Sequence, residues 1–157
     1  LGRRDRTLHL FDTYQGMSCP TAEDEPRAHA RWHRDQREDG NDWNRVLMEE
    51  VRENLRSTGY PEDSIRFVKG PVEETLPAQA PQSLALLRLD MDLHDPTRHA
   101  LERLWPRLSR GGILLIDDYG DFTGCRKAVD DYFRGCGEPI FLGRIDSSAR
   151  IGVRLRG

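Results

Sequence analysis

The sequence predicts an open α/β fold in which a mostly parallel sheet ends in a C-terminal antiparallel hairpin. Short apolar runs alternate with segments of helical periodicity, which is the pattern of strands joined by crossover helices. Two of the runs, LALLRL at 84–89 and GILLI at 112–116, are almost continuously apolar, as in parallel strands that helices cover on both faces. With 157 residues, 36% of them hydrophobic, the chain has the size of one domain, which we place at 1–157.

The first half contains two predicted strands and one predicted helix. Residues 7–11 (TLHLF) and 65–68 (IRFV) have the composition of strands, and a polar residue or a glycine soon follows each. Apolar residues recur at helical spacing from 46 to 55, and Gly59 then supplies a stop signal. Residues 18–42 are rich in proline, charge and histidine and lack a sustained apolar period, so we expect a long mobile loop or lid there.

The second half alternates more regularly between the two kinds of pattern. The elements that we expect there are, in chain order, a strand at 84–89, a helix at 96–108, a strand at 112–116 and a helix at about 123–134. The chain then closes with a predicted hairpin that pairs 139–142 with 150–155 around the turn-forming residues 146–148.

The charge distribution and the cysteines limit the partners and the compartment. The chain has 24 Lys and Arg against 27 Asp and Glu, with both signs interspersed, so no basic stripe predicts binding to nucleic acid or to a membrane surface. No apolar run reaches the roughly 18 residues of a membrane helix. The 3 cysteines form no CxxC pair, which fits a reducing, cytoplasmic compartment, and we expect them to be inert packing residues.

Acidic residues follow both continuous apolar strands. Asp90 and Asp92 come after the LALLRL strand, and Asp117 and Asp118 come after the GILLI strand. If these strands are neighbours, the carboxylates converge at the carboxyl ends of the strands, where open α/β sheets bind ligands. Carboxylates this close repel one another unless a cation neutralises them, and an all-oxygen ligand set with room for water favours magnesium. We therefore predict Asp90, Asp117 and Asp118 as ligands of Mg²⁺.

Two residues compete for the role of general base. Asp92 lies two residues beyond the first predicted ligand and would point the same way if the strand continued. His94 is the rival, because the ordinary pKa of histidine lies nearer neutrality. The structural alternative for the acidic pair is that Asp117 and Asp118 cap the helix that follows them, as we expect Asp95 to cap its own helix.

Weaker signals lie elsewhere in the chain. Asp12 closes the first strand, where an acid in dinucleotide-type sheets accepts hydrogen bonds from ribose hydroxyls, although Asp residues at strand ends also form turns. The segment KGPVE at 69–73 opens a helix, with or without a binding role. Four side chains in or near the lid either hold a sugar or planar ring or tether the lid to the domain: His29, Trp32, His33 and Trp43.

Four segments resemble a known family. LFDTYQGM (10–17), STGYPEDSIRFVKGPVEETLP (57–77), the stretch 86–133 with its RLDMDLHD and LLIDDYGD, and RIDSSARIGVR (144–154) are similar to the macrocin, mycinamicin and novobiocin-sugar O-methyltransferases. The DxD followed by a strand and IDDY is the specific part of this match. The resemblance implies a Rossmann-like class I methyltransferase sheet, S-adenosylmethionine as methyl donor, Mg²⁺ as cofactor, and methylation of a sugar hydroxyl of a glycosylated natural product.

The resemblance also implies roles for residues by their position. The three predicted metal ligands match the family's metal ligands, and Asp92 matches its proposed base. Asp12 matches the acid that holds the cofactor ribose, while Gly70 and Val72 lie in the segment that lines the adenine. We further expect a small-molecule glycoside as partner and a homo-oligomeric enzyme.

Two departures from the family affect these expectations. Family members place a strand and a glycine-rich turn of the form ExGVxxGGS before the LFD strand, and this sequence has neither. We therefore expect the chain to be part of a longer enzyme, with a gap in the sheet between the 7–11 and 84–89 strands and no complete activity on its own. In addition, His94 stands where the family often has an aromatic residue, which leaves the division of roles between Asp92 and His94 open.

Two other function classes share the acidic pattern. A metal-dependent hydrolase or phosphotransferase also places Asp residues at strand ends, but it would need a phosphate cradle or a nucleophile, and the sequence has no P-loop. The non-catalytic alternative is a receiver-like magnesium-binding domain or a remnant. A receiver would gather its acidic pair at its first strand, whereas here the pair follows a late strand.

Overall fold

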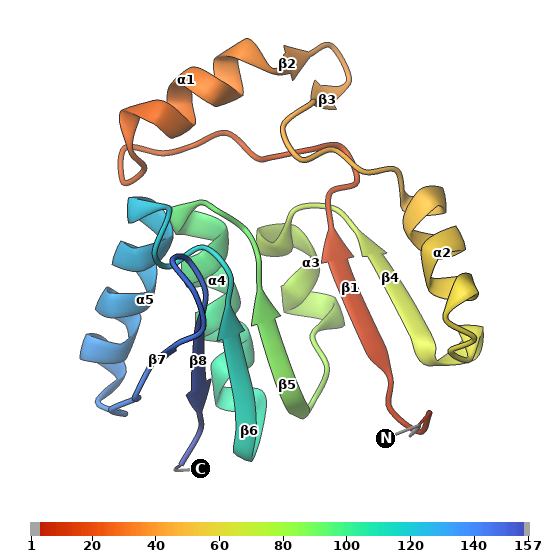
Figure 1. The fold of residues 1–157 in the computed structure, drawn as a ribbon, viewed down its shortest axis with the longest axis vertical. Coiled ribbons are helices and arrows are strands. Elements are labelled where there is room, and N and C mark those ends of the chain that lie inside the picture. The colour runs from red at the N-terminus through yellow and green to blue at the C-terminus, as the bar shows by residue number, and fades with distance from the viewer. Residues whose placement is uncertain (1–3, 156–157) are drawn as a thin grey trace.

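Two separate sheets carry the fold in the computed structural model, which describes residues 4–155 (Figure 1). In the smaller sheet, β1 (Leu8–Asp12) pairs in parallel with β4 (Ile65–Lys69). The larger sheet consists, in spatial order, of β5 (Leu84–Leu89), β6 (Leu108–Ile116), β8 (Arg150–Val153) and β7 (Gly143–Arg144). β5 and β6 are parallel, whereas β8 runs antiparallel to both of its neighbours. The predicted α/β class, mostly parallel with a closing antiparallel hairpin, is confirmed.

The expected gap in the sheet lies between β1 and β5. Figure 1 shows these strands next to each other and pointing the same way, yet within residues 4–155 no ladder of hydrogen bonds joins them. Each strand pairs on one side only, so an unpaired edge of β1 faces an unpaired edge of β5. Such edges expose backbone donors and acceptors that a further strand can satisfy.

Three helices pack on one face of the larger sheet and form its core. These are α3 (Val72–Gln79), α4 (His94–Leu104) and α5 (Thr123–Cys136). Their buried side chains meet those of β5 and β6 in a single cluster, in which Leu101, Leu114 and Val129 are completely buried. α3 also contacts both strands of the smaller sheet, and Phe11 of β1 packs against the same cluster, so one core joins the two sheets.

Within residues 4–155, no helix covers the opposite face of the larger sheet (Figure 1). Leu86 is 53% exposed. It pairs with Ile113 on β6, which in turn pairs with Val153 on β8, and Val153 is 40% exposed. Ile151 is exposed on the same strand, two residues away. The apolar runs predict strands buried on both faces, and within the described residues only the helical face meets that expectation.

Several element boundaries differ from the sequence prediction. The helix expected to reach 108 ends at Leu104 and continues as a short 3₁₀ turn, because Pro106 cannot donate a helical hydrogen bond. The hairpin begins at 143, so the predicted strand at 139–142 is wrong: Ile140 and Leu142 pack against the core without pairing to a strand. The turn is confirmed, since the Ser148 amide donates to Asp146 Oδ1 at 2.8 Å.

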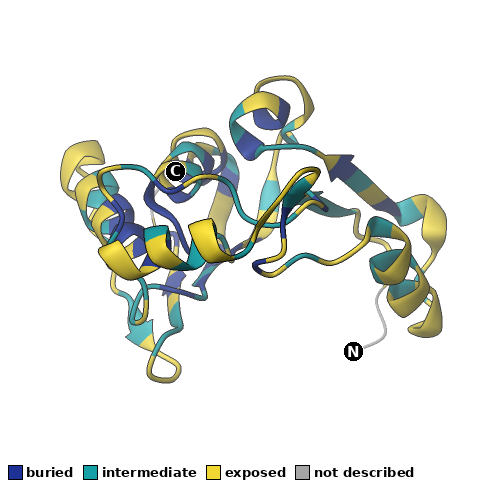
Figure 2. Cartoon of the chain, turned by 90° about the horizontal axis from the view of Figure 1, so that it is seen from above, coloured by how far each residue is buried: buried dark blue, intermediate teal, exposed yellow. Residues whose placement is uncertain are grey.

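The lid segment, residues 18–42, contains more regular structure than its sequence predicts. It holds α1 (Pro26–Arg34) and a hairpin of β2 (Gln36–Arg37) and β3 (Gly40–Asn41). Pro26 at the first helical position suits the start of α1. Figure 1 shows the segment running across the carboxyl ends of the strands, and Figure 2, which views the molecule from above, shows mostly exposed and half-buried residues there. Its action as a lid stays a prediction.

The remaining helical elements flank the smaller sheet. α2 (Met48–Ser57) leads from the lid segment toward β4, and the 3₁₀ turn η1 (Glu62–Ser64) comes directly before that strand. Across residues 4–155, no helix is both long enough and apolar enough to cross a bilayer.

Candidate active site

Three carboxylates meet at the carboxyl ends of β5 and β6. The parallel register places Leu89 opposite Ile116, so Asp90 and the Asp117–Asp118 pair leave neighbouring strands at the same level. The amide of Asp117 donates to the carbonyl of Leu89 at 2.9 Å, which keeps the two chains together beyond the ladder. One oxygen from each carboxylate lies within 4.8 Å of the other two. The adjacency on which the metal prediction depends is confirmed, and we call Asp90, Asp117 and Asp118 the acidic cluster.

Asp118 is the buried member of the acidic cluster and does not cap the next helix. The residue is 7% exposed, and its Oδ2 accepts hydrogen bonds from the amides of Met91 and Asp92, both at 3.1 Å. The carboxylate therefore holds the turn that follows β5 in place. The cap on α5 comes instead from Glu25, whose Oε2 accepts from the Thr123 amide at 3.1 Å.

Asp92 occupies a strained and buried position beside the acidic cluster. The strand does not continue to it, as its φ of 56° lies in the left-handed region, which costs a non-glycine residue energy. Asp92 is 5% exposed, and the side-chain amide of Asn44 donates to its Oδ2 at 3.2 Å. Burial, a hydrogen bond with Asp118 and the negative charge of Asp118 raise the pKa of Asp92 to about 8. Without a cation, this carboxyl holds its proton near neutral pH.

Arg88 is a functional candidate that sequence reasoning missed. Its Nη1 lies 2.7 Å from Asp90 Oδ2, and its Nη2 donates to Asp117 Oδ1 at 2.9 Å. The pKa of Asp90 is still raised, because burial and the charges of Asp117 and Asp118 outweigh the attraction of Arg88. The signal was available in the sequence: a single arginine interrupts an otherwise apolar strand two residues before Asp90.

His94, the rival base, lies in the first turn of α4 and is buried. Its Nδ1 lies 2.6 Å from Asp95 Oδ1, so this ring nitrogen is engaged within the helix rather than with the acidic cluster. Asp95 is not the N-cap that the sequence predicts. That role belongs to Asp24 of the lid segment, whose Oδ1 accepts from the His94 amide at 2.8 Å.

Asp24 and Glu25 fasten the lid segment to the starts of α4 and α5. Asp24 is buried, and its Oδ2 also accepts from the Thr21 amide at 2.8 Å. The space around it is tight, since a Cβ added at Gly124 would lie 2.0 Å from Asp24 Oδ1. Two carboxylates at helix N-termini are also favoured by the helix dipoles.

The aromatic residues of the lid segment tether it to the domain. Trp43 is 1% exposed and forms a small buried cluster with Ala28 and with Leu93, which directly precedes α4. Trp43 stacks on Phe122 with ring centroids 5.9 Å apart, and Trp32 donates to the backbone carbonyl of Met17, just before the segment, at 3.0 Å. Of the two interpretations of these aromatics, the contacts support tethering.

The residues expected at the methyl donor lie at the carboxyl ends of β1 and β4. Asp12 ends β1, and the amide of Gly70 donates to its carbonyl at 2.9 Å, so these two residues are adjacent. The Asp12 carboxylate accepts from the Tyr14 amide at 2.6 Å, which is the turn-forming role. Gly70 has a φ of 135°, which glycine adopts readily. Val72 is buried in the core at the start of α3.

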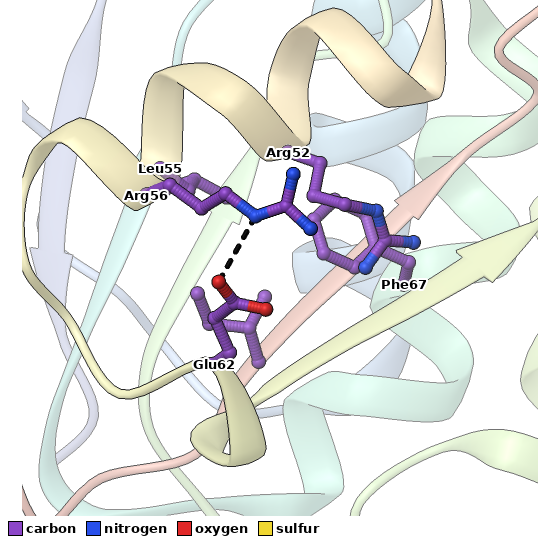
Figure 3. A pocket seen from close by; sticks show the side chains of 6 residues that line it. Arg52, Leu55, Arg56, Glu62 and Phe67 are labelled. Carbon is purple, nitrogen blue, oxygen red and sulfur yellow. Dashed lines mark hydrogen bonds and ion pairs between the residues drawn. The ribbon is translucent and has the colours of Figure 1, made fainter.

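A small pocket between α2 and β4 lies away from all of these groups (Figure 3). The Arg52 guanidinium lies 4.4 Å from the centre of the Phe67 ring, and Arg56 Nε pairs with Glu62 Oε1 at 2.9 Å. Glu62 precedes β4, so this hollow extends toward the amino end of the strand, opposite to the end that carries the candidate site. It contributes no group to that site.

The donor set of the acidic cluster fits a hard divalent cation. All of its donors are carboxylate oxygens, and two of the three residues are half exposed, which leaves room for water or a hydroxyl ligand. Neither cysteine nor imidazole contributes, so softer transition metals have no preferred ligand there.

Comparison with known proteins gives a consistent result. The family model for macrocin O-methyltransferase (TylF) matches residues 1–151. A tetracenomycin rhamnosyl 4′-O-methyltransferase of Streptomyces olivaceus is 38% identical over 135 residues, which cover 83% of this chain and 48% of that protein. The demethyldecarbamoylnovobiocin O-methyltransferase of Streptomyces niveus is 36% identical over 132 residues, covering 82% of this chain and 48% of that protein.

Solved structures agree with the sequence matches. The O-methyltransferase NovP superposes with a TM-score of 0.84 at 33% identity, covering 97% of this chain and 61% of that chain. The calicheamicin methyltransferase CalS11 shares the fold, with a TM-score of 0.69 at 22% identity over 97% of this chain and 62% of its own. The chain thus spans about half the length of the curated relatives that it matches.

Proposed function

Because the chain belongs to the macrocin O-methyltransferase family, we propose that it carries the metal-binding part of an S-adenosylmethionine-dependent enzyme that methylates a sugar hydroxyl of a glycosylated natural product. The observation that carries this proposal is the convergence of the acidic cluster at adjacent strand ends. The family membership also argues against the hydrolase and receiver alternatives, to which the acidic pattern alone is open.

Asp90, Asp117 and Asp118 would hold Mg²⁺ in this enzyme. When bound, the ion lowers the cost of forming negative charge on a sugar hydroxyl oxygen, which is a poor nucleophile at neutral pH. The carboxylates would also orient the acceptor. By fixing the position of the ion, they would hold an acceptor with neighbouring hydroxyls in one pose relative to the methyl donor.

Asp92 is the better candidate for the base that takes the hydroxyl proton. It lies beside the acidic cluster, and its Oδ2 accepts a hydrogen bond from the side-chain amide of Asn44. A cation at the cluster opposes protonation of Asp92, which leaves its oxygens free to accept a proton from a hydroxyl about 3 Å away. His94 is the weaker candidate, because its Nδ1 is engaged by Asp95.

The methyl donor would bind across the carboxyl ends of β1 and β4. Asp12 offers the carboxylate oxygen that does not hold the Tyr14 amide to the ribose hydroxyls. Gly70 allows a close approach of the backbone to the adenine, and Val72 supports that segment from the core. We further propose a small-molecule glycoside as the acceptor and a homo-oligomeric enzyme.

Removing one cluster carboxylate tests the metal role. In the complete enzyme, we expect Asp117→Asn to abolish magnesium-dependent transfer of a labelled methyl group to a glycoside while the circular dichroism spectrum stays unchanged. Asp63→Asn, which removes an exposed carboxylate in η1, is the matched control and should keep full activity. Undiminished turnover of the unmodified enzyme in excess chelator would refute the metal role.

A further inference from the structure

The acidic cluster already has a positive charge beside it, supplied by the chain itself. The Arg88 guanidinium bridges Asp90 and Asp117, with nitrogen to oxygen distances of 2.7 and 2.9 Å. These are two of the three carboxylates whose oxygens lie within 4.8 Å of one another. The third, Asp118, is held instead by backbone amides. The contacts of Arg88 therefore fall on the two half-exposed members of the cluster.

The position of Arg88 allows its guanidinium to move away from the acidic cluster into solvent. It alternates along β5 with Leu87 and Leu89, which are buried, so its side chain lies on the uncovered face of the sheet. The side chain is 53% exposed, so it can turn toward solvent. Its charge cannot be removed by a change of pH in the physiological range. Burial lowers the pKa of Arg88, but the charges of Asp90 and Asp117 outweigh this effect and raise it.

We propose that Arg88 is the resident counter-ion of the acidic cluster and that a divalent cation binds there by displacing its guanidinium, so that Arg88 sets the affinity of the metal site. The inference rests on the proposed metal-assisted function. A divalent ion on the same carboxylates would lie a few ångströms from the guanidinium, where like charges repel strongly. Mg²⁺ also demands a compact set of oxygens at short distance, and Arg88 already engages one oxygen of Asp90 and one of Asp117.

The two opposite roles open to Arg88 predict opposite results. A counter-ion competes with the metal, so its removal strengthens metal binding. A residue that merely orients Asp90 and Asp117 for the metal would weaken binding when it is removed. Metal affinity, measured without substrate, therefore separates the two roles independently of catalysis.

The test is a titration of the metal-free protein with Mn²⁺, followed by the electron paramagnetic resonance signal of the free ion. We expect Arg88→Gln to bind Mn²⁺ about tenfold more tightly than the unmodified protein, in line with the loss of two ion pairs that oppose binding. Arg88→Lys keeps the charge on a flexible stem and should stay within about threefold of the unmodified protein. Arg110→Gln removes an exposed charge near the other end of β6 and should change the affinity less than twofold.

Each outcome decides the matter. Equal or weaker Mn²⁺ binding by Arg88→Gln, with an unchanged circular dichroism spectrum, overturns the counter-ion role while leaving the metal site standing. If Arg88→Gln does not fold, Arg88→Ala takes its place under the same criterion. If neither the unmodified protein nor any variant binds Mn²⁺ at millimolar concentration, the proposed metal-assisted function fails, and the counter-ion role fails with it.

Discussion

The two sheets differ in how firmly they are built. In the larger sheet, β5 and β6 bury Leu87, Leu89, Leu114 and Ile116 against three helices. In the smaller sheet, β1 contains no fully buried residue, and neither does the neighbouring helix α2. Two-stranded sheets are marginal by themselves, so the smaller one depends on α3 and on Phe11 for its attachment to the common core.

This contrast separates the two tasks of the candidate site. The carboxylates that would hold a cation project from the well-packed sheet, where a small displacement of a ligand atom is costly. The residues expected at the methyl donor project from the weaker sheet. Metal binding should therefore survive perturbations that loosen the donor side.

The largest expected effect is on the core of the larger sheet. Leu114→Ala should lower the free energy of unfolding by about 4 kcal/mol, because the side chain is completely buried and leaves a cavity. Leu55→Ala in α2, which has no buried residue, should cost about 1 kcal/mol. Urea denaturation of both variants measures the difference, and equal losses would contradict the contrast between the sheets.

The next effect concerns Asp92 in the metal-free protein. Because folding raises the pKa of this carboxyl from 3.8 to about 8, its stabilising contribution is complete below pH 4 and is lost as the pH rises toward 8. Each pKa unit corresponds to about 1.4 kcal/mol, so we expect a loss of at least about 2 kcal/mol between pH 5 and 8.

Asp92→Asn should remove that slope. The measurement is urea denaturation across this pH range in the presence of a chelator, with Asp63→Asn as the control that keeps the slope. A stability that does not depend on pH in the unmodified protein would show that Asp92 is not buried beside like charges.

Amide hydrogen exchange probes the same contrast without mutation. We expect the amides in the middle of β6 to exchange at least about tenfold more slowly than those of β1, which corresponds to about 1.4 kcal/mol in local opening. β6 is paired on both sides and β1 on one side only, so the comparison is restricted in β1 to the amides that are hydrogen-bonded to β4, and the difference then reports on packing. Similar protection of both strands, measured by nuclear magnetic resonance, would mean that the smaller sheet is as firmly held as the larger.

The smallest effect concerns the attachment of the lid segment. Gly124→Ala places a methyl group against Asp24 and should release the start of α4, which we expect to raise the rate of proteolysis within residues 18–42 severalfold at a cost of about 1 kcal/mol. Gly135→Ala lies in the same helix in open space and is the matched control. Unchanged cleavage of the Gly124 variant would show that Asp24 does not fasten the segment.

The sequence predicted well what depends on local pattern. The strand at 84–89 has the predicted bounds, and the Asp117–Asp118 pair lies at the end of its strand, because continuous apolar runs mark buried strands and polar residues mark their ends. Parallel pairing of these strands then places the carboxylates together. The expected gap beside β1 follows from the strand order of the family that the sequence resembles.

What depended on distant contacts was missed. The cap of α4 comes from Asp24, 70 residues earlier, and the cap of α5 from Glu25, 98 residues earlier, so no local capping motif exists to be found. The left-handed backbone of Asp92 ends the strand before the alternation of side chains reaches it. Ile140 and Leu142 are apolar because they pack against the core, and apolar composition alone does not distinguish that role from a strand.

The parallel direction of β1 and β5 gives the interval between their open edges a polarity. A peptide that pairs in parallel with both edges must run in the same direction as β1 and β5, from their amino ends toward Asp12 and Asp90. Its last residues, and the turn that follows, are then delivered between the two carboxylates, whereas its first residues stay at the remote side. The direction of an added strand thereby determines which of its ends lies at the candidate site.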